Sequence, residues 1–172
     1  YPAIDAAVES VRLEVRAPEG MRAVSAGRLI GFSTQGGQTI SRWQIDPLTE
    51  RLSLSVGRYI TTTSHEGRVP VSTYFLSDDA SLAATYIEAS INYIAMYEAK
   101  FGAYPFPKFA VVENFFPTGY GFPSYTLIGG RVLRLPFIVK TSLGHEIAHC
   151  WWGNGVRLDD ADGNWSEGLT SY

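Results

Sequence analysis

The period of the hydrophobic pattern changes once along the chain, near Ser77, and this change limits the fold more than any other feature. Before it, apolar and polar residues alternate, as in residues 11–16 and 52–56, which is the period of half-buried β-strands. Residues 34–38 contain two adjacent glycines, as expected for a hairpin loop. Residues 1–76 are therefore expected to form an antiparallel β-rich part.

After Ser77 the period becomes helical. Ser77, Asp78 and Asp79 carry side chains that can cap the start of a helix, and Gly102 favours its end. Between them, apolar residues at three- and four-residue spacing form one stripe: Ile87, Ile91, Ile94, Tyr97 and Phe101. We interpret this stripe as core packing rather than a cofactor surface.

The rest of the chain mixes short strands and helices. Residues 109–112 and 124–128 are typical of strands, and the Gly- and Pro-containing loop between them includes 119–121, which we interpret as a flexible turn. A helix is expected from Pro136 to about Trp152, and another near Trp165. The sequence thus predicts an α+β chain, with a β-rich part at residues 1–76 and a mixed α/β part at residues 77–172.

Composition excludes several classes of protein. The chain has 172 residues, of which 45% are hydrophobic and 18% charged, so it should bury a core. The net charge of −3 and the scattered arginines argue against a nucleic-acid-binding surface. No apolar run approaches the ~20 residues of a membrane span. The single cysteine, Cys150, excludes an internal disulfide, and we interpret it as a buried small hydrophobe rather than a metal ligand.

Residues 145–149 read His-Glu-Ile-Ala-His and carry the chemistry. At ~100° per residue, positions four apart lie about 40° apart around a helix, so His145 and His149 can converge on one metal ion. Zn²⁺ favours such nitrogen ligands, and a catalytic zinc site keeps one position for water. Glu146 lies one residue further round the helix, where its carboxylate can act as a base on that water.

Glu167 is the candidate third ligand, at the start of the next expected helix. Two unrelated histidines on a surface helix would be the alternative reading. The apolar residues on both sides of the motif argue against it, because unpaired histidines are costly in such surroundings. The acidic residues of the intervening loop are interpreted as solvated turn residues: Asp159, Asp160 and Asp162.

Residues 145–149 together with residues 165–172 resemble the gluzincin motif, in particular that of the zinc aminopeptidase family of aminopeptidase N and leukotriene hydrolase. Trp-Gly-Asn at 152–154 matches the continuation of the helix motif in that family. The similarity extends upstream, at uneven strength, over three further stretches: residues 18–27, 54–59 and 101–108.

The resemblance implies a fold and a function. Residues 1–76 would be the last strands of a saddle-like N-terminal β domain, and residues 77–172 the start of a thermolysin-like catalytic domain. The function implied is zinc-dependent hydrolysis of peptide bonds with one Zn²⁺ ion and a peptide substrate. The chain begins without Met and stops soon after Glu167, so we expect it to be part of a longer protein.

The chain departs from the family in three places. Seventeen residues separate His149 from Glu167, one fewer than is usual in the family. The Gly-x-Met-Glu-Asn strand is missing, and alignment puts Thr118 where its amine-binding glutamate belongs. The tyrosine that stabilises the oxyanion would lie beyond Tyr172, so the chain alone is expected to be poorly active, since such a donor is worth ~3 kcal/mol.

These departures leave more than one functional hypothesis. The first is an aminopeptidase-like enzyme with altered recognition of the substrate N-terminus, in which Thr118, Gly119, Tyr120 and Gly121 line the substrate cleft. The second is a non-catalytic, zinc-stabilised, peptide-binding module derived from a peptidase. The third is an endopeptidase. Glu146 argues against the second, because a structural zinc needs no base and usually has four protein ligands.

Overall fold

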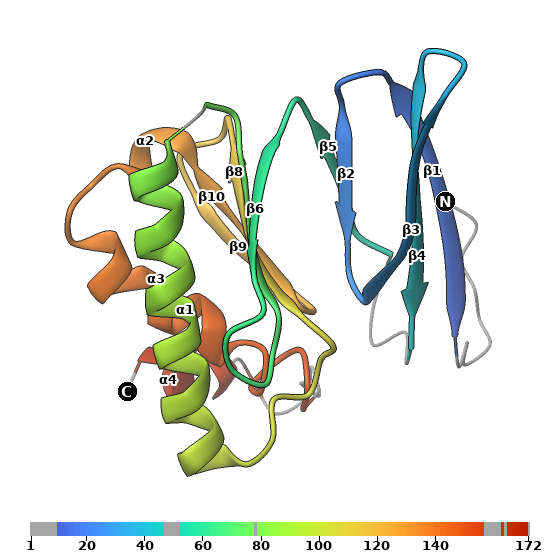
Figure 1. Cartoon of the computed structure of the whole chain (residues 1–172). Helices are drawn as coiled ribbons and strands as arrows, with labels where there is room; N and C mark the ends of the chain where they lie inside the picture. The colour runs from blue at the N-terminus through green and yellow to red at the C-terminus, as the bar shows by residue number, and fades with distance from the viewer. Residues whose placement is uncertain (1–9, 47–51, 78, 157–162, 164, 172) are drawn as a thin grey trace. The chain divides into compact units, whose positions relative to one another are not determined.

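The computed structural model describes residues 10–46, 52–77, 79–156, 163 and 165–171. The chain is α+β, as expected, and divides into two compact units, Tyr1–Arg58 and Tyr59–Tyr172 (Figure 1). The sequence placed the change of architecture at residues 76/77. The units divide earlier because β6 (Ile60–Ser64) and β7 (Val71–Phe75) pair into the same sheet as the strands that follow α1.

Unit 1 consists of antiparallel strands. β1 (Val11–Pro18), β4 (Gln38–Ile45) and β3 (Arg28–Gln35) form one sheet in that order, and β2 (Arg22–Ser25) pairs with β5 (Leu54–Gly57). The hairpin predicted at residues 34–38 is confirmed: Gln35 pairs with Gln38 across Gly36 and Gly37, which both have positive φ.

The alternation along β1 is confirmed, with its apolar side chains turned inward. The alternation at residues 52–56 is real but faces the other way. Leu54 and Val56 are about 40% exposed, whereas Ser53 is buried and Ser55 is half-buried. The hydroxyl of Ser25 donates to the carbonyl of Ser53 at 2.7 Å. This buried hydrogen bond gives the Ser25 hydroxyl and the Ser53 carbonyl a partner. Polar groups that are paired in this way can be buried, so hydrophobicity alone does not decide which face of the strand is buried.

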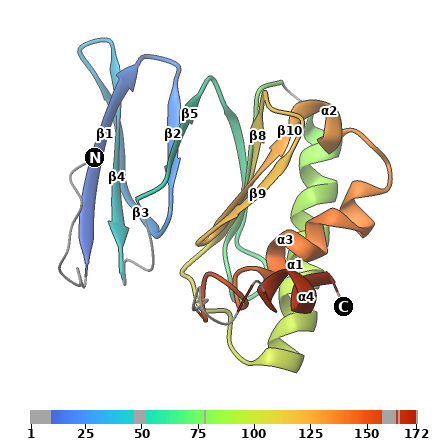
Figure 2. The same ribbon diagram turned by 180° about the vertical axis from the view of Figure 1, so that it is seen from behind.

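Unit 2 is built on one mixed sheet covered by helices on one face (Figures 1 and 2). Its strand order is β6-β7-β8-β10-β9, with β8 at Phe109–Asn114, β10 at Tyr125–Gly129 and β9 at Gly119–Phe122. β7, β8 and β10 run parallel, while β6 and β9 are antiparallel to their neighbours.

Helix α1 (Ala80–Phe101) packs on β7 and β6. Of the predicted stripe, Ile87 and Ile94 are buried, whereas Phe101 is 40% exposed and its ring contacts Trp151. Asp79 caps it by accepting a hydrogen bond from the backbone N–H of Leu82 at 2.9 Å, and Gly102, with φ of 92°, ends it. Both predicted ends are therefore confirmed. Asp78 lies outside the described residues.

The helix predicted from Pro136 to Trp152 is wrong in length. A 3₁₀ turn at Ile138–Lys140 precedes α3 (Ser142–Ala148), and α2 (Gly130–Leu133) lies further upstream. The hydroxyl of Thr141 donates to the carbonyl of Phe137 at 3.0 Å, a side-chain bond that competes with continuous helix. At the other end Gly153 takes φ of 105°, which stops the chain from continuing as helix.

Residues 119–121 are a strand rather than the flexible turn expected. They belong to β9, which pairs with Tyr125–Ile128 of β10. The sequence shows no hydrophobic alternation there because two of the three residues are glycines, and their strand is fixed by backbone pairing instead. The helix expected near Trp165 is present as α4 (Trp165–Ser171). Within the described part of the chain, no helix is long and apolar enough to span a membrane.

Candidate metal centre

Helix α3 packs into the core of unit 2 through one face, and its opposite face carries the histidines. Leu143 and Ile147 are fully buried in the core of unit 2. His145 lies two residues from each, on the opposite side of the helix, and His149 follows one turn later. The apolar spacing of α3 thus fixes which way both imidazoles point.

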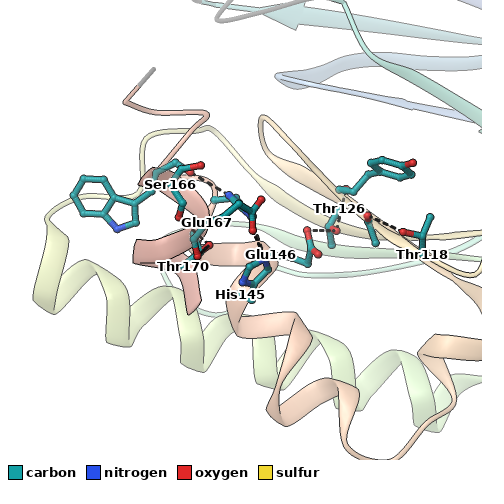
Figure 3. A network of polar contacts seen from close by, with 11 residues as sticks. Thr118, Thr126, His145, Glu146, Ser166, Glu167 and Thr170 are labelled. Carbon is teal, nitrogen blue, oxygen red and sulfur yellow. Dashed lines mark hydrogen bonds and ion pairs between the residues drawn. The ribbon is translucent and has the colours of Figure 1, made fainter. Parts of the chain in front are cut away.

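The structure brings His145, His149 and Glu167 together, and Figure 3 shows His145 beside Glu167. The two Nε2 atoms are 3.2 Å apart. Glu167, from the first turn of α4, places Oε2 3.4 Å from Nε2 of His145 and Oε1 3.4 Å from Nε2 of His149. Two histidines four positions apart and a glutamate 18 to 22 positions further along the chain therefore direct their ligand atoms at one point.

These separations fit a zinc ion. Tetrahedral zinc with bonds of about 2.0–2.1 Å holds its ligand atoms about 3.3–3.4 Å from one another. The Nε2–Nε2 separation of 3.2 Å is close to such an edge, and each nitrogen lies 3.4 Å from a different oxygen of the Glu167 carboxylate, so the three residues can reach one ion. Two imidazole nitrogens and a carboxylate are also a donor set typical of catalytic zinc, which leaves a fourth position for water.

The outer nitrogen of His149 is held by the backbone. Its Nδ1 lies 3.2 Å from the carbonyl oxygen of Trp152, so Nδ1 carries the proton and donates, and Nε2 keeps its lone pair for a metal. Such bonds fix the tautomer and the ring direction of a ligand histidine. The turn from His149 to Trp152 makes this bond possible, because a continuing helix would carry the carbonyl away.

Glu146 points toward the sheet rather than toward Glu167 (Figure 3). Its Oε2 lies 3.5 Å from the hydroxyl of Thr126 on β10, at the long limit of a hydrogen bond. Burial raises the pKa of the Glu146 carboxyl above its ordinary value; the charge of Glu167 adds to this, and His145 and Thr126 oppose it. A half-buried carboxylate with a raised pKa is a better proton acceptor than an exposed one.

The other residues proposed from sequence lie on or next to β9. Gly119 and Gly121 line the space that the Glu146 carboxylate occupies. Tyr120, between them, is 56% exposed. Thr118 is half-buried, and its hydroxyl donates to the carbonyl of Gly119 at 3.3 Å. A Cβ atom added at either glycine would meet Glu146 of α3.

Sequence reasoning missed Thr126. It is fully buried in β10, and its hydroxyl donates to the carbonyl of Tyr120 at 3.1 Å. A threonine in a short strand is common, and nothing in the sequence marks this one as a functional residue. The register that pairs it with Gly121 brings it to Glu146, and that register is visible only in the folded sheet.

Comparisons with known proteins assign no family to this site. Neither a scan against protein-family models nor a search of curated proteins finds a match for the chain. The ligand set and the glutamate beside it are therefore the observations on which a function depends.

Proposed function

We propose that this chain carries the zinc centre of a gluzincin-type metallopeptidase that hydrolyses peptide bonds. The observation that carries the proposal is the convergence of His145, His149 and Glu167 with Glu146 alongside. Unit 1 would be the end of an N-terminal β domain, and unit 2 the start of a thermolysin-like catalytic domain. The activity would be aminopeptidase-like, with altered recognition of the substrate N-terminus.

His145, His149 and Glu167 would hold the ion. Bound there, Zn²⁺ would lower the pKa of a water molecule and polarise a carbonyl group. Glu146 would accept the proton of the attacking water and pass it to the leaving amine, the two transfers of general base and general acid catalysis. Its raised pKa supports both steps, because the protonated carboxyl must persist long enough to reach the amine.

An extended peptide fits the surroundings of this site. β9 is the last strand in the order of its sheet, among the residues described. Edge strands bind extended peptides through main-chain hydrogen bonds. A peptide paired with β9 would lie beside Glu146, because the glycines of β9 contact that carboxylate.

A non-catalytic zinc module is the second candidate. The missing amine-binding glutamate favours it, but Glu146 argues against it. A structural zinc has no use for a half-buried carboxylate aimed away from its ligands. An endopeptidase keeps the same chemistry and differs only in how the substrate N-terminus is recognised.

Zinc analysis tests the metal centre directly. Purified wild-type protein is expected to bind one zinc ion per chain, and His149→Ala to lose most of it, because three-ligand sites depend on each ligand. His65→Ala is the matched control, since His65 is exposed in a loop. Equal zinc content in wild type and His149→Ala would contradict the assignment. Zinc-dependent hydrolysis of peptides by the native full-length protein separates the enzyme from the non-catalytic module.

A further inference from the structure

Three positions surround the Glu146 carboxylate from the sheet side: Gly119 and Gly121 on β9 and Thr126 on β10. The antiparallel register pairs Gly121 with Thr126 and Gly119 with Ile128. Directly paired residues lie on the same face of a sheet, as do residues two apart along a strand. The three positions therefore share the face that contacts α3.

The glycines leave the space that the carboxylate fills. A Cβ atom at position 119 would lie 2.7 Å from Oε1 of Glu146, and one at position 121 would lie 3.2 Å from Oε2. The 2.7 Å contact at position 119 would force the carboxylate to shift, whereas the 3.2 Å contact at position 121 is tight and would displace it by only a few tenths of an ångström. Any larger residue at 119 would thus push the carboxylate toward another position.

Thr126 supports the same carboxylate from the neighbouring strand. Its hydroxyl hydrogen has two acceptors within reach, the carbonyl of Tyr120 at 3.1 Å and Oε2 of Glu146 at 3.5 Å. The hydroxyl is therefore placed to donate to the carboxylate. The side chain is fully buried, so water does not compete for these contacts.

We propose that Gly119, Gly121 and Thr126 are positioning residues that hold the Glu146 carboxylate where it meets the attacking water. This inference rests on the proposed peptidase function. In the described part of the chain, none of the three residues forms a hydrogen bond to His145, His149 or Glu167. They would act through Glu146. A general base must be held close to its productive geometry, because a displacement of about 1 Å can cost about a hundredfold in rate.

Gly119→Ala tests the steric half of this proposal. The added methyl group meets the flexible end of Glu146 rather than backbone, so the carboxylate should move while the fold persists. Zinc content, Tm and KM are expected to stay at wild-type values, and kcat to fall by about tenfold to a hundredfold. A crystal structure of the variant should show the carboxylate displaced. Gly31→Ala, a strand glycine of unit 1 with its nearest neighbour 3.7 Å away, is the control and should change nothing.

Thr126→Val and Thr126→Ser test the polar half. Valine keeps the shape but removes the hydroxyl, so kcat should fall by about tenfold with KM unchanged. Serine restores the hydroxyl and should restore kcat. Equal loss in both variants would assign Thr126 to packing and overturn its positioning role.

The outcomes separate this inference from the proposed function. If Glu146→Gln abolishes turnover while Gly119→Ala and Thr126→Val both keep wild-type kcat, the positioning role is wrong and the peptidase function stands. An unmoved carboxylate in the crystal structure of Gly119→Ala has the same meaning. If Glu146→Gln keeps full turnover, or the wild type shows no zinc-dependent hydrolysis, the proposed function fails and the inference fails with it.

Discussion

Glu146 and His145 are neighbours in the chain, yet their side chains diverge. The His145 imidazole lies 3.4 Å from Glu167, whereas the Glu146 carboxylate lies beside Thr126 on the sheet. This divergence follows from the ~100° step between helical residues. It separates a residue that would hold a metal from a residue that would move a proton.

Replacing Glu146 by glutamine tests that separation. Glu146→Gln is expected to bind zinc as the wild type does, because the amide fills the same space and none of the three ligands changes. Turnover by the native full-length protein should fall by about a hundredfold or more, since an amide cannot accept the proton. Zinc content and kcat are measured on the same preparation. Wild-type turnover with zinc retained would show that another group is the base.

Recognition of the substrate N-terminus is the second property decided by single residues. Thr118 is neutral, and Glu113, the nearest carboxylate before it in sequence, is buried and engaged. Glu113 accepts hydrogen bonds from Arg134 and from the backbone N–H of Leu76, both at 2.8 Å. Neither residue therefore offers a free carboxylate to a substrate ammonium group.

The preference for unblocked peptides should consequently be weak. A carboxylate bound to the substrate ammonium is worth roughly 1.5–3 kcal/mol, which corresponds to about one to two orders of magnitude in kcat/KM. Matched peptides with free and acetylated N-termini should differ by less than about tenfold. A preference of about a thousandfold for the free amine would place the protein with ordinary aminopeptidases.

Among the elements, Glu113 connects three segments: the end of β8, the link between β7 and α1, and the residues after α2. It lies at the end of β8, accepts from the backbone that follows β7, and pairs with Arg134 beyond α2. Arg134 in turn donates to the hydroxyl of Ser77, just before α1. The buried carboxylate thus connects the sheet to both helices at this end of unit 2.

Removing Arg134 should weaken this connection. Arg134→Met leaves the carboxylate of Glu113, whose side chain is 7% exposed, without its counter-charge. The free energy of unfolding is expected to fall by about 1–3 kcal/mol, the usual cost of an unpaired buried polar group. Arg131→Met, at an exposed arginine of α2, should change it by less than about 0.5 kcal/mol. Urea denaturation of the three proteins gives the comparison, and equal stability would contradict the role of the pair.

Elements with strong local signals could be predicted from the sequence. α1 combined a long apolar stripe with Asp79 and Gly102 at its ends, and the structure has all three. β9 and the break before α3 could not be predicted. Pairing with β10 makes β9 a strand, and a 3₁₀ turn at Ile138–Lys140 replaces the start of the predicted helix, so both depend on contacts that no periodicity reveals.

The candidate site likewise has a part that the sequence predicts and a part that it does not. The spacing of His145 and His149 on a helix predicts their convergence from geometry alone. The contact of Glu146 with Gly119 and Thr126 joins segments 20 or more residues apart, and it depends on the register of an edge strand. Sequence therefore points to the ligands, and the fold supplies their surroundings.

In the molecule as a whole, unit 2 contains a half-buried lysine whose pKa is strongly lowered. The Nζ atom of Lys108 donates to the carbonyl of Ser124 at 3.1 Å and lies 5.0 Å from the ring centre of Tyr125. Burial lowers the pKa of Lys108 to about 7, while the neighbouring Cys150 thiol acts in the opposite direction. Burial also raises the pKa of Cys150 to about 11.

The stability of the folded chain should therefore rise between pH 7 and pH 9. Over this range unfolded Lys108 keeps its proton, since its ordinary pKa is about 10.4, whereas folded Lys108 loses it. The unfolded state then binds more protons, so the free energy of unfolding increases with pH, by on the order of 1 kcal/mol per pH unit. Above about pH 9 the Cys150 thiol opposes this rise, because it ionises more readily in the unfolded chain.

Denaturation at pH 7, 8 and 9 measures how the free energy of unfolding changes with pH. A chelator is present to remove the effect of metal. Lys108→Met should abolish the rise with pH, and Lys100→Met, at an exposed lysine of α1, should leave it intact. A rise that persists in Lys108→Met would show that another group titrates and that Lys108 is charged in the folded protein.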